Sequence, residues 1–352
     1  MSAVLDNKMP APAPAAQRSE GVWHAAWRRL RTDRVGMLAM AIVAAFILLI
    51  VLTSARLVAR DWQVEKGVPS APPTFMGPSK QEAASVIESP KGPNVDLSDI
   101  DPLAPRYAEW AERAKQYKTE EAPRAQTLPF GGDRLGRDVL TKTIKGTQTS
   151  VFVGLIGALF AAVIGTVLGA LAGFFGGRIG DFIEWVYNVF TAIPDVLLIL
   201  AFAAIFGRGV GSVAIILSLV GWTGLYRQVR AEFLKHSSRE YVRAAEAIGA
   251  SVSSRMFRHI LPNVSHVIFV RMSLLVVGFI KYEVILSYLG LGVSVDDVSW
   301  GTMLAEAQPE LILGHWWQLV SATLFMAVFI TAFSMMTDAL RDALDPKLRG
   351  LE

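Results

Sequence analysis

Two long runs without a single charged residue limit what this chain can fold into. Val35–Ala55 and Gly146–Gly177 contain no Asp, Glu, Lys or Arg. A helix crosses the hydrocarbon core of a bilayer with about 20 apolar residues, and the first run would extend about 31 Å as a helix. Hydrophobic residues make up 52% of the chain and charged residues only 18%, which departs from soluble proteins. The sequence therefore predicts an all-α, polytopic membrane protein.

Composition and missing motifs exclude most catalytic roles. The formal net charge of +3 is small, and the basic residues lie beside apolar runs, which argues against a nucleic-acid partner and for membrane lipid. The chain has no cysteine, so disulfides, thiolate metal sites and cysteine nucleophiles are excluded. It also lacks the patterns G-x-x-x-x-G-K-[ST], H-E-x-x-H and G-x-S-x-G. We therefore expect no catalytic residue, no metal and no cofactor bound by this chain, ATP included.

Hydropathy predicts six membrane helices, which place both ends of the chain on one side. Lys and Arg gather between the fourth and fifth helices, whereas Ser294–Trp317 contains neither. Because basic loops remain on the cytoplasmic side, both termini are predicted to be cytoplasmic. The predicted spans are Val35–Val58, Ser150–Phe175, Phe182–Phe206, Gly211–Tyr226, Ser265–Leu289 and Gln318–Leu340.

The remaining segments divide the chain into six parts. Residues 1–21 are predicted to be a disordered cytoplasmic tail, and 22–34 an interfacial amphipathic helix or a cytoplasmic extension of the first membrane helix, 35–58. Residues 59–149 form an extracytoplasmic segment and the lead-in to the second helix. Within it, Asp61–Pro129 is a lid, a docking element or disordered chain, with a short helix at Arg106–Lys118. A core of five membrane helices (150–340) and a cytoplasmic tail (341–352) complete the chain.

A stripe of small residues marks the second predicted helix. Gly165, Gly169, Gly173 and Gly177 recur every four residues, so they lie on one helix face. Such a stripe lets another helix backbone approach closely. The pattern predicts tight packing and carries no information about substrate.

The basic cytoplasmic segment, 227–264, is the most informative part of the sequence. Ala244, Ala245 and Ala247 favour a helix, Gly249 is suited to ending it, and Ser251 is suited to capping the next one. Small side chains also permit a close approach to another protein. The candidate contact residues are Glu240, Arg243, Ala244, Ala245, Gly249, Ala250, Ser251, Arg255, Leu261 and Pro262.

This segment resembles the signature loop of ABC-importer permeases, written E-A-A, three residues, G, nine residues, I-x-L-P. Arg243 stands where the pattern has Glu, and His259 where it has Ile. Further segments resemble the C-type permease subunit of dipeptide and oligopeptide importers. They are Phe130–Leu140 (FGGDRLGRDVL), Glu283–Gly292, Ser299–Leu304 (SWGTML) and Leu340–Arg349.

The resemblance implies a type I ABC importer permease fold in a bacterial inner membrane. It further implies a homologous second permease, two cytoplasmic ATPase subunits that bind ATP and magnesium, and an extracytoplasmic substrate-binding protein. The chain would supply half of a peptide pathway and couple it to the ATPases through residues 227–264. Relatives of this family also carry nickel chelates, glutathione or oligosaccharides, so the resemblance leaves these solutes as alternative substrates.

Four of the charged residues inside the predicted membrane helices are candidate functional residues. Asp195, Arg271, Lys281 and Glu283 are costly in hydrocarbon, so each is expected to face protein or water. They are candidates to line the pathway, with pairing to the second permease or snorkelling as the alternatives. A self-contained secondary transporter is the competing class, and it would show internal repeats with paired broken helices.

Overall fold

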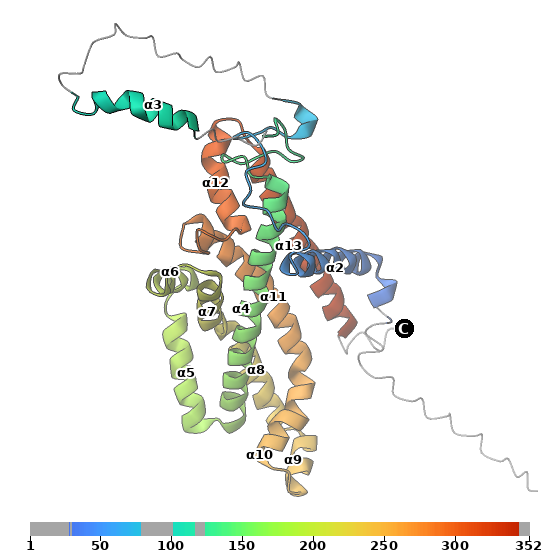
Figure 1. The fold of residues 1–352 in the computed structure, drawn as a ribbon. Helices are drawn as coiled ribbons and strands as arrows, with labels where there is room; N and C mark the ends of the chain where they lie inside the picture. The colour runs from blue at the N-terminus through green and yellow to red at the C-terminus, as the bar shows by residue number, and fades with distance from the viewer. Residues whose placement is uncertain (1–27, 29, 79–100, 117–123, 345–352) are drawn as a thin grey trace, which may run out of the picture.

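The computed structural model describes residues 28, 30–78, 101–116 and 124–344, and these residues form an all-helical bundle (Figure 1). The short helical turns are η1 (Thr74–Met76), η2 (Ala104–Arg106) and a π-helical turn, Arg255–Ile260. The helices are α2 (Arg34–Ser54), α3 (Tyr107–Gln116), α4 (Val139–Phe175), α5 (Gly177–Thr191), α6 (Asp195–Phe206), α7 (Val210–Gly221), α8 (Thr223–Ser237), α9 (Glu240–Ala247), α10 (Val252–Ser254), α11 (Leu261–Tyr288), α12 (Trp300–Ile312) and α13 (Trp317–Leu344).

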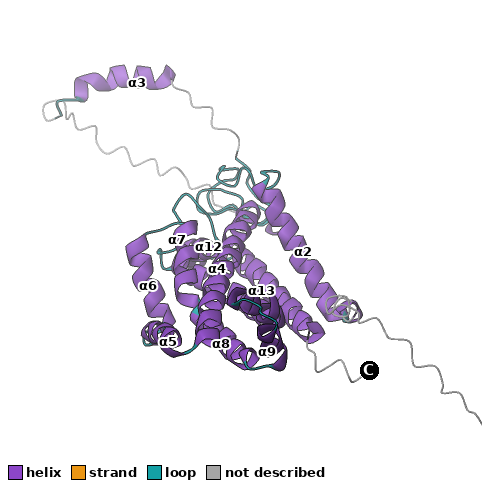
Figure 2. Ribbon diagram, turned by 90° about the horizontal axis from the view of Figure 1, so that it is seen from below, coloured by secondary structure: helices purple, strands orange, loops and turns teal. Residues whose placement is uncertain are grey.

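The central element is α4, a helix of 37 residues that contacts α2, α5, α7, α8, α11, α12 and α13. Asp138 starts it, because its carboxylate accepts from the backbone N–H groups of Leu140 and Thr141. The helix therefore begins eleven residues before the predicted Ser150. Seen from below, α5 and α6 lie on one side of α4 and α2 lies at the opposite edge (Figure 2).

Four helical segments are long and apolar enough to cross a membrane, and two bent helix pairs raise the number to six. The straight spans are Arg34–Ser54, Val139–Phe175, Val252–Tyr288 and Trp317–Ala343. The third predicted span is α5 followed by α6, bent by 86°. Pro194 causes this break, because proline removes an N–H donor and drives the preceding residue out of the helical conformation.

The fourth predicted span is α7 followed by α8, with a bend of 42°. Helix α8 extends to Ser237 and therefore includes Arg227, Arg230 and Lys235, which were predicted to lie in a loop. Arginine, lysine and glutamate are good helix formers, and no glycine or proline interrupts α8 after Gly224. The first span, by contrast, ends at Ser54, four residues before the predicted Val58.

Two stretches far apart in sequence pack together at the outer end of the bundle, and we call residues 61–78 and 124–138 the outer cap. The N–H of Gly67 donates to the carbonyl of Gly136 (2.9 Å), and that of Thr74 to the carbonyl of Leu128 (2.8 Å). Ala71 is fully buried. These parts of the Asp61–Pro129 segment are therefore folded. The predicted short helix is present as α3, which lies apart from the bundle (Figure 1).

The glycine stripe of α4 packs against α8, as predicted for three of its four residues. A Cβ placed on Gly165, Gly169 or Gly173 would lie 2.8, 2.8 and 2.5 Å from the carbonyl oxygens of Trp222, Tyr226 and Arg230. Gly177 is the exception, because it lies beyond the end of α4 and begins α5 with a φ of +46°. Most of the predicted amphipathic helix 22–34 lies outside the described residues.

Candidate functional site

The predicted turn between α9 and α10 is closed by a glycine in the left-handed conformation. Gly249 has a φ of +86°. Its N–H donates to the carbonyl of Glu246, and the N–H of Ala250 donates to the carbonyl of Ala245, each at 2.9 Å. This pair of bonds is a Schellman ending, which satisfies the last carbonyls of α9. The prediction that Gly249 ends the helix is confirmed.

The chain then re-enters a helix with a cap on its first turn. The Ser251 hydroxyl accepts from the N–H of Ser254 (3.3 Å), which confirms the predicted cap. The helix runs on through the π-helical turn into α11, so Val252–Tyr288 is one continuous span. Pro262 lies inside this continuous span, directly after the π-helical turn, and has no N–H to donate to the preceding turn of the helix.

One face of this segment is fixed to its own chain. Val242 and Ala245 are buried, and Val242 packs in a cluster with Phe233, Met256 and Ile260. The small side chain of Ala245 therefore serves packing within this chain. An ion pair between Arg255 and Glu246 (2.6 Å) holds the two arms of the turn together.

The other face is open to a partner. Glu240, Arg243, Ala244 and Gly249 are exposed, and a Cβ on Gly249 would meet no atom within 4 Å. Ile248 is 86% exposed at the tip of the turn. An aliphatic side chain this exposed, between small residues and flanking charges, is suited to insertion into a groove of another protein. Ser251 is exposed beside this face, whereas Ala250, Arg255 and Leu261 are half-buried.

The four candidate pathway residues do not form a single cluster on the surface of this chain. Glu283 is completely buried, and its Oε1 accepts from the Ser287 hydroxyl at 2.7 Å. Lys281 lies two residues before Glu283, therefore on a different face of α11, and is exposed. Arg271 is half-buried, and a Cβ on Gly224 of α8 would lie 2.5 Å from its Nη2. Asp195 is exposed in the first turn of α6, just after the break in the third span.

Comparisons with known families agree with this geometry. The profile described as "Binding-protein-dependent transport system inner membrane component" matches residues 165–350, more than half of the chain. The chain belongs to this family. A second profile, "N-terminal TM domain of oligopeptide transport permease C", matches residues 21–73 and includes α2. The chain is thus a permease component whose matched region contains the whole α9–α10 turn.

Several curated relatives are similar over much of the permease. The dipeptide transport system permease protein DppC of Bacillus subtilis is 39% identical over 62% of this chain and 69% of the relative. The oligopeptide transport system permease protein OppC of the same organism is 34% identical over 70% and 81%. DppC of Lactococcus lactis is 28% identical over 92% and 90%. A solved structure of the MetNI methionine ABC transporter aligns with 58% of this chain and 96% of its own, at 14% identity and a TM-score of 0.48.

A buried charge network, which sequence reasoning missed, joins the outer cap of the permease to α4, α12 and α13. Lys142 is 1% exposed, and its ammonium lies 2.7 Å from Asp133 and contacts Glu306 as well. The Arg137 guanidinium also donates to Asp133 (2.7 Å). Gln318, at the start of α13, bonds Glu306 at 3.4 Å. Asp133, Arg137 and Lys142 therefore each have an oppositely charged partner, as burial of ions requires.

The pKa values of the two most buried carboxyl groups of this region, Asp133 and Glu310, are shifted in opposite directions. For Asp133, burial works against ionisation, but the ammonium of Lys142 and the guanidinium of Arg137 outweigh it and lower the pKa. For Glu310, burial dominates and raises the pKa, although its Oε1 accepts from the N–H of Arg134 at 2.9 Å. The charge on Asp133 raises the pKa of Glu310 further.

The sequence contained only part of the signal for this network. Asp133 and Arg137 stand in the segment that resembles the family pattern, but Glu306 and Gln318 lie more than 160 positions away from Lys142. No local spacing indicates such a pairing. Lys142 could have indicated the network, since a lysine inside a helix that crosses a membrane requires a partner.

Proposed function

We propose that the chain is the permease subunit of an ATP-driven importer for dipeptides or oligopeptides in a bacterial inner membrane. It pairs with a homologous second permease, two cytoplasmic ATPase subunits and an extracytoplasmic substrate-binding protein. ATP and magnesium bind to the ATPase subunits, and this chain contributes no catalytic residue. Relatives named as dipeptide and oligopeptide permeases support the substrate class, and the placement of basic residues supports cytoplasmic termini.

The observation that carries this proposal is the α9–α10 turn. The turn is held rigidly by its Schellman ending and by the Arg255–Glu246 ion pair, yet its tip carries Ile248 into solvent. A rigid element with an exposed aliphatic tip is suited to binding a partner, because little free energy is spent on ordering it. Closure of the ATPases would push on this turn, and α11, continuous with it, would carry the movement into the membrane.

The intramembrane charges supply the proposed contacts with the peptide. Arg271 and Lys281 on α11 are suited to peptide carboxylates, and Asp195 at the break between α5 and α6 to an amino group. The completely buried Glu283 has a different proposed role. Its bond with Ser287, whose hydroxyl also accepts from the N–H of Val293, fixes the loop that follows α11.

The test compares two isoleucines of nearly equal exposure at opposite ends of the helical bundle (Figure 1). Ile248 is 86% exposed at the α9–α10 turn, and Ile312 is 83% exposed at the end of α12. Neither packs inside the chain, so Ile248→Ser and Ile312→Ser should both leave the permease folded. We expect Ile248→Ser alone to weaken ATPase co-purification about tenfold or more, as truncation of an interface anchor does.

The measurement is the amount of ATPase retained by the purified permease pair, together with substrate-stimulated ATP hydrolysis. If Ile248→Ser and Ile312→Ser behave alike in both assays, the turn is not the coupling site. Transport of labelled peptides into vesicles that contain the assembled complex tests the substrate class separately. Absence of peptide uptake by an otherwise coupled complex would reject peptides and keep the coupling role.

A further inference from the structure

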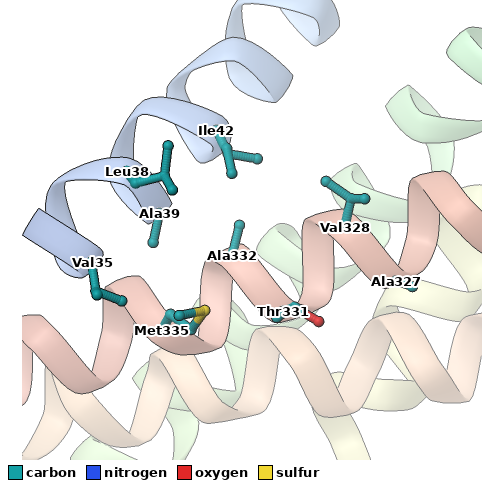
Figure 3. A pocket seen from close by; sticks show the side chains of 9 residues that line it. All are labelled: Val35, Leu38, Ala39, Ile42, Ala327, Val328, Thr331, Ala332 and Met335. Carbon is teal, nitrogen blue, oxygen red and sulfur yellow. The ribbon is translucent and has the colours of Figure 1, made fainter.

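An apolar groove between α2 and α13 takes no part in the sites described above. It consists of two adjoining hollows of about 350 and 340 Å³ that share Val328. Leu38 and Ile42 of α2 form one wall, and Val328 and Met335 of α13 form the other (Figure 3). The groove follows α2 from Val35 to Leu49, about 21 Å along the helix.

Both hollows are small. Buried alanines lie at the floor of the first hollow, where Figure 3 shows Ala39 and Ala332 pointing toward each other across the gap. Larger side chains stand at its edges, where Leu38 is 64% and Met335 41% exposed. A helix of the same length and about 10 Å across would occupy roughly 1,600 Å³, more than twice the volume of the two hollows together. A single chain of methylene groups fits such a trough.

Both helices that form the groove, α2 and α13, are long and apolar enough to cross a membrane. Thr331 is the only residue with a polar side chain among those that line the two hollows. Gly36 closes the seam at one end, since a Cβ there would lie 2.6 Å from the Cβ of Ala339. Water has no polar partners in such a trough, so an apolar chain is the occupant that its surface favours.

Charge at one end of the groove indicates which apolar molecule enters it. Arg34 is exposed at the first position of α2, one helical turn before Leu38 and therefore on the same side of the helix. A guanidinium at the membrane surface binds phosphate. Asp338 and Asp342 are exposed on α13 near this end, so recognition depends on the contact with Arg34 and not on a strongly positive field.

We propose that the α2–α13 groove binds one acyl chain of a membrane phospholipid whose phosphate lies at Arg34. The lipid fills the seam along which α2 is attached to the bundle. It stabilises α2 in a position where the helix buries only a narrow face, made of Gly36, Ala39, Val43 and Thr53. This inference concerns the lipid contacts of the chain, and it stands whether or not the transported solute is a peptide.

The first experiment places a photoreactive benzophenone amino acid at Leu38 in the complete transporter in its own membrane. The control position is Ile205, which is 77% exposed on α6. After illumination and extensive detergent washing, mass spectrometry identifies what is attached. A phospholipid adduct at position 38 that exceeds the adduct at position 205 severalfold supports the proposal. An adduct with the second permease at position 38, or equal lipid yields at both positions, would overturn it.

The second experiment fills the groove without touching its packed floor. Ala327 is exposed in the groove and Ala204 is exposed on α6, so Ala327→Trp and Ala204→Trp are a matched pair. Native mass spectrometry with added phosphatidylglycerol should show one retained phospholipid fewer in Ala327→Trp and no change in Ala204→Trp. Arg34→Gln should lower retention of the same lipid. Wild-type retention in both Ala327→Trp and Arg34→Gln would reject the groove as a lipid site.

Discussion

At the scale of single residues, the left-handed backbone of Gly249 matters more than its missing side chain. The sequence pattern predicted both a helix-ending conformation and a close approach to a partner, and the structure shows the first directly with a φ of +86°. Within this chain a Cβ at Gly249 would meet open space. Any cost of substitution inside the chain is therefore a backbone cost.

This separation leads to a prediction for Gly249→Ala. The left-handed conformation costs an L-residue roughly 1–2 kcal/mol, so the α9–α10 turn should open about fivefold to thirtyfold more often. Gly249→Asn should open less, because asparagine tolerates this conformation. The measurement is hydrogen exchange at the Ala250 amide, which is bonded to the carbonyl of Ala245. Equal exchange in wild type and Gly249→Ala would mean that the turn is not strained by a side chain.

A second residue-scale prediction concerns Glu310 and pH. Its pKa is raised in the folded chain, chiefly by burial, from an ordinary value of 4.5. The folded state then holds the proton over a range where the unfolded state has lost it, so stability falls as pH rises from about 4.5 through the folded pKa. Glu310→Gln should remove this loss and stabilise the permease at neutral pH, since the amide oxygen can still accept from Arg134.

The control for Glu310 is Asp133, whose lowered pKa makes its effect on stability change with pH in the opposite direction and in a more acidic range. Its contribution to stability is present above an ordinary pKa of 3.8 and disappears as pH falls through the lower folded value. Thermal unfolding of the detergent-purified protein from acid to neutral pH separates the two groups. The account of Glu310 is wrong if Glu310→Gln keeps the wild-type decline in melting temperature above pH 4.5.

At the scale of elements, the α4–α8 contact depends on glycines whose importance can be isolated by a matched pair. A Cβ on Gly169 would lie 2.8 Å from the Tyr226 carbonyl and 2.9 Å from the Val229 Cβ, neither of which can rotate away. Gly278 lies inside α11 with nothing within 4 Å of its Cβ position. Gly169→Ala should therefore destabilise the bundle by about 1–3 kcal/mol, and Gly278→Ala should be neutral or stabilising by up to about 1 kcal/mol.

Melting temperatures of the two glycine variants provide the measurement. A lower value for Gly169→Ala and an unchanged or higher value for Gly278→Ala would show that close helix approach, and not helix propensity, explains the stripe. Similar shifts in both variants would contradict this explanation. The prediction applies to the membrane core of the permease and is independent of its partners.

The elements that the sequence predicted well are those with strong local signals. Apolar length indicated every span, and Pro194 marked the break in the third, because its effect on the backbone is local. The helix α12 was missed. Its start is a capping box made by Ser299 and Thr302, whereas the usual signature has Glu or Gln at the later position. Pro309 near its end also reads as a helix breaker.

The candidate site divides in the same way. The turn around Gly249 and Ser251 was predictable because each residue acts on its immediate neighbours. The inward orientation of Ala245 and the burial of Glu283 were not, since both depend on how their helices pack against other elements. The network around Lys142 combines α4, α12 and α13, and no pattern within one segment indicates which carboxylate reaches the lysine.

At the scale of the whole molecule, the outer cap is part of the fold and not a detachable segment. Trp317, the first residue of α13, donates from Nε1 to the carbonyl of Gly132 at 2.7 Å. Asp133, in the same stretch, is the buried partner of Lys142 in α4. The cap therefore covers the outer ends of two membrane helices. Removing all of 61–129 would take away the first stretch and residues 124–129 of the second, and leave 130–138 without their partners.

This arrangement predicts that two deletions will differ sharply. Replacing 79–123 by a flexible linker of about ten residues keeps both cap stretches and the Glu65–Arg124 ion pair (2.8 Å) that joins them. That variant should insert, fold and melt like wild type. Replacing 61–129 removes the bonds from Gly67 and Thr74 and uncovers the Asp133–Lys142 pair. Its folded yield should fall severely, because the ends of α4 and α13 lose the stretch that packs against them.

Folded yield and melting temperature decide the structural part of this prediction, and co-purification of the substrate-binding protein decides the functional part. If the 79–123 replacement folds normally but loses the binding protein, the segment that contains α3 is a docking element. If it folds normally, retains the binding protein and transports at the wild-type rate, that segment is a linker. Normal folding of the 61–129 replacement would show that the outer ends of α4 and α13 do not need the cap, and would remove the structural role assigned to it.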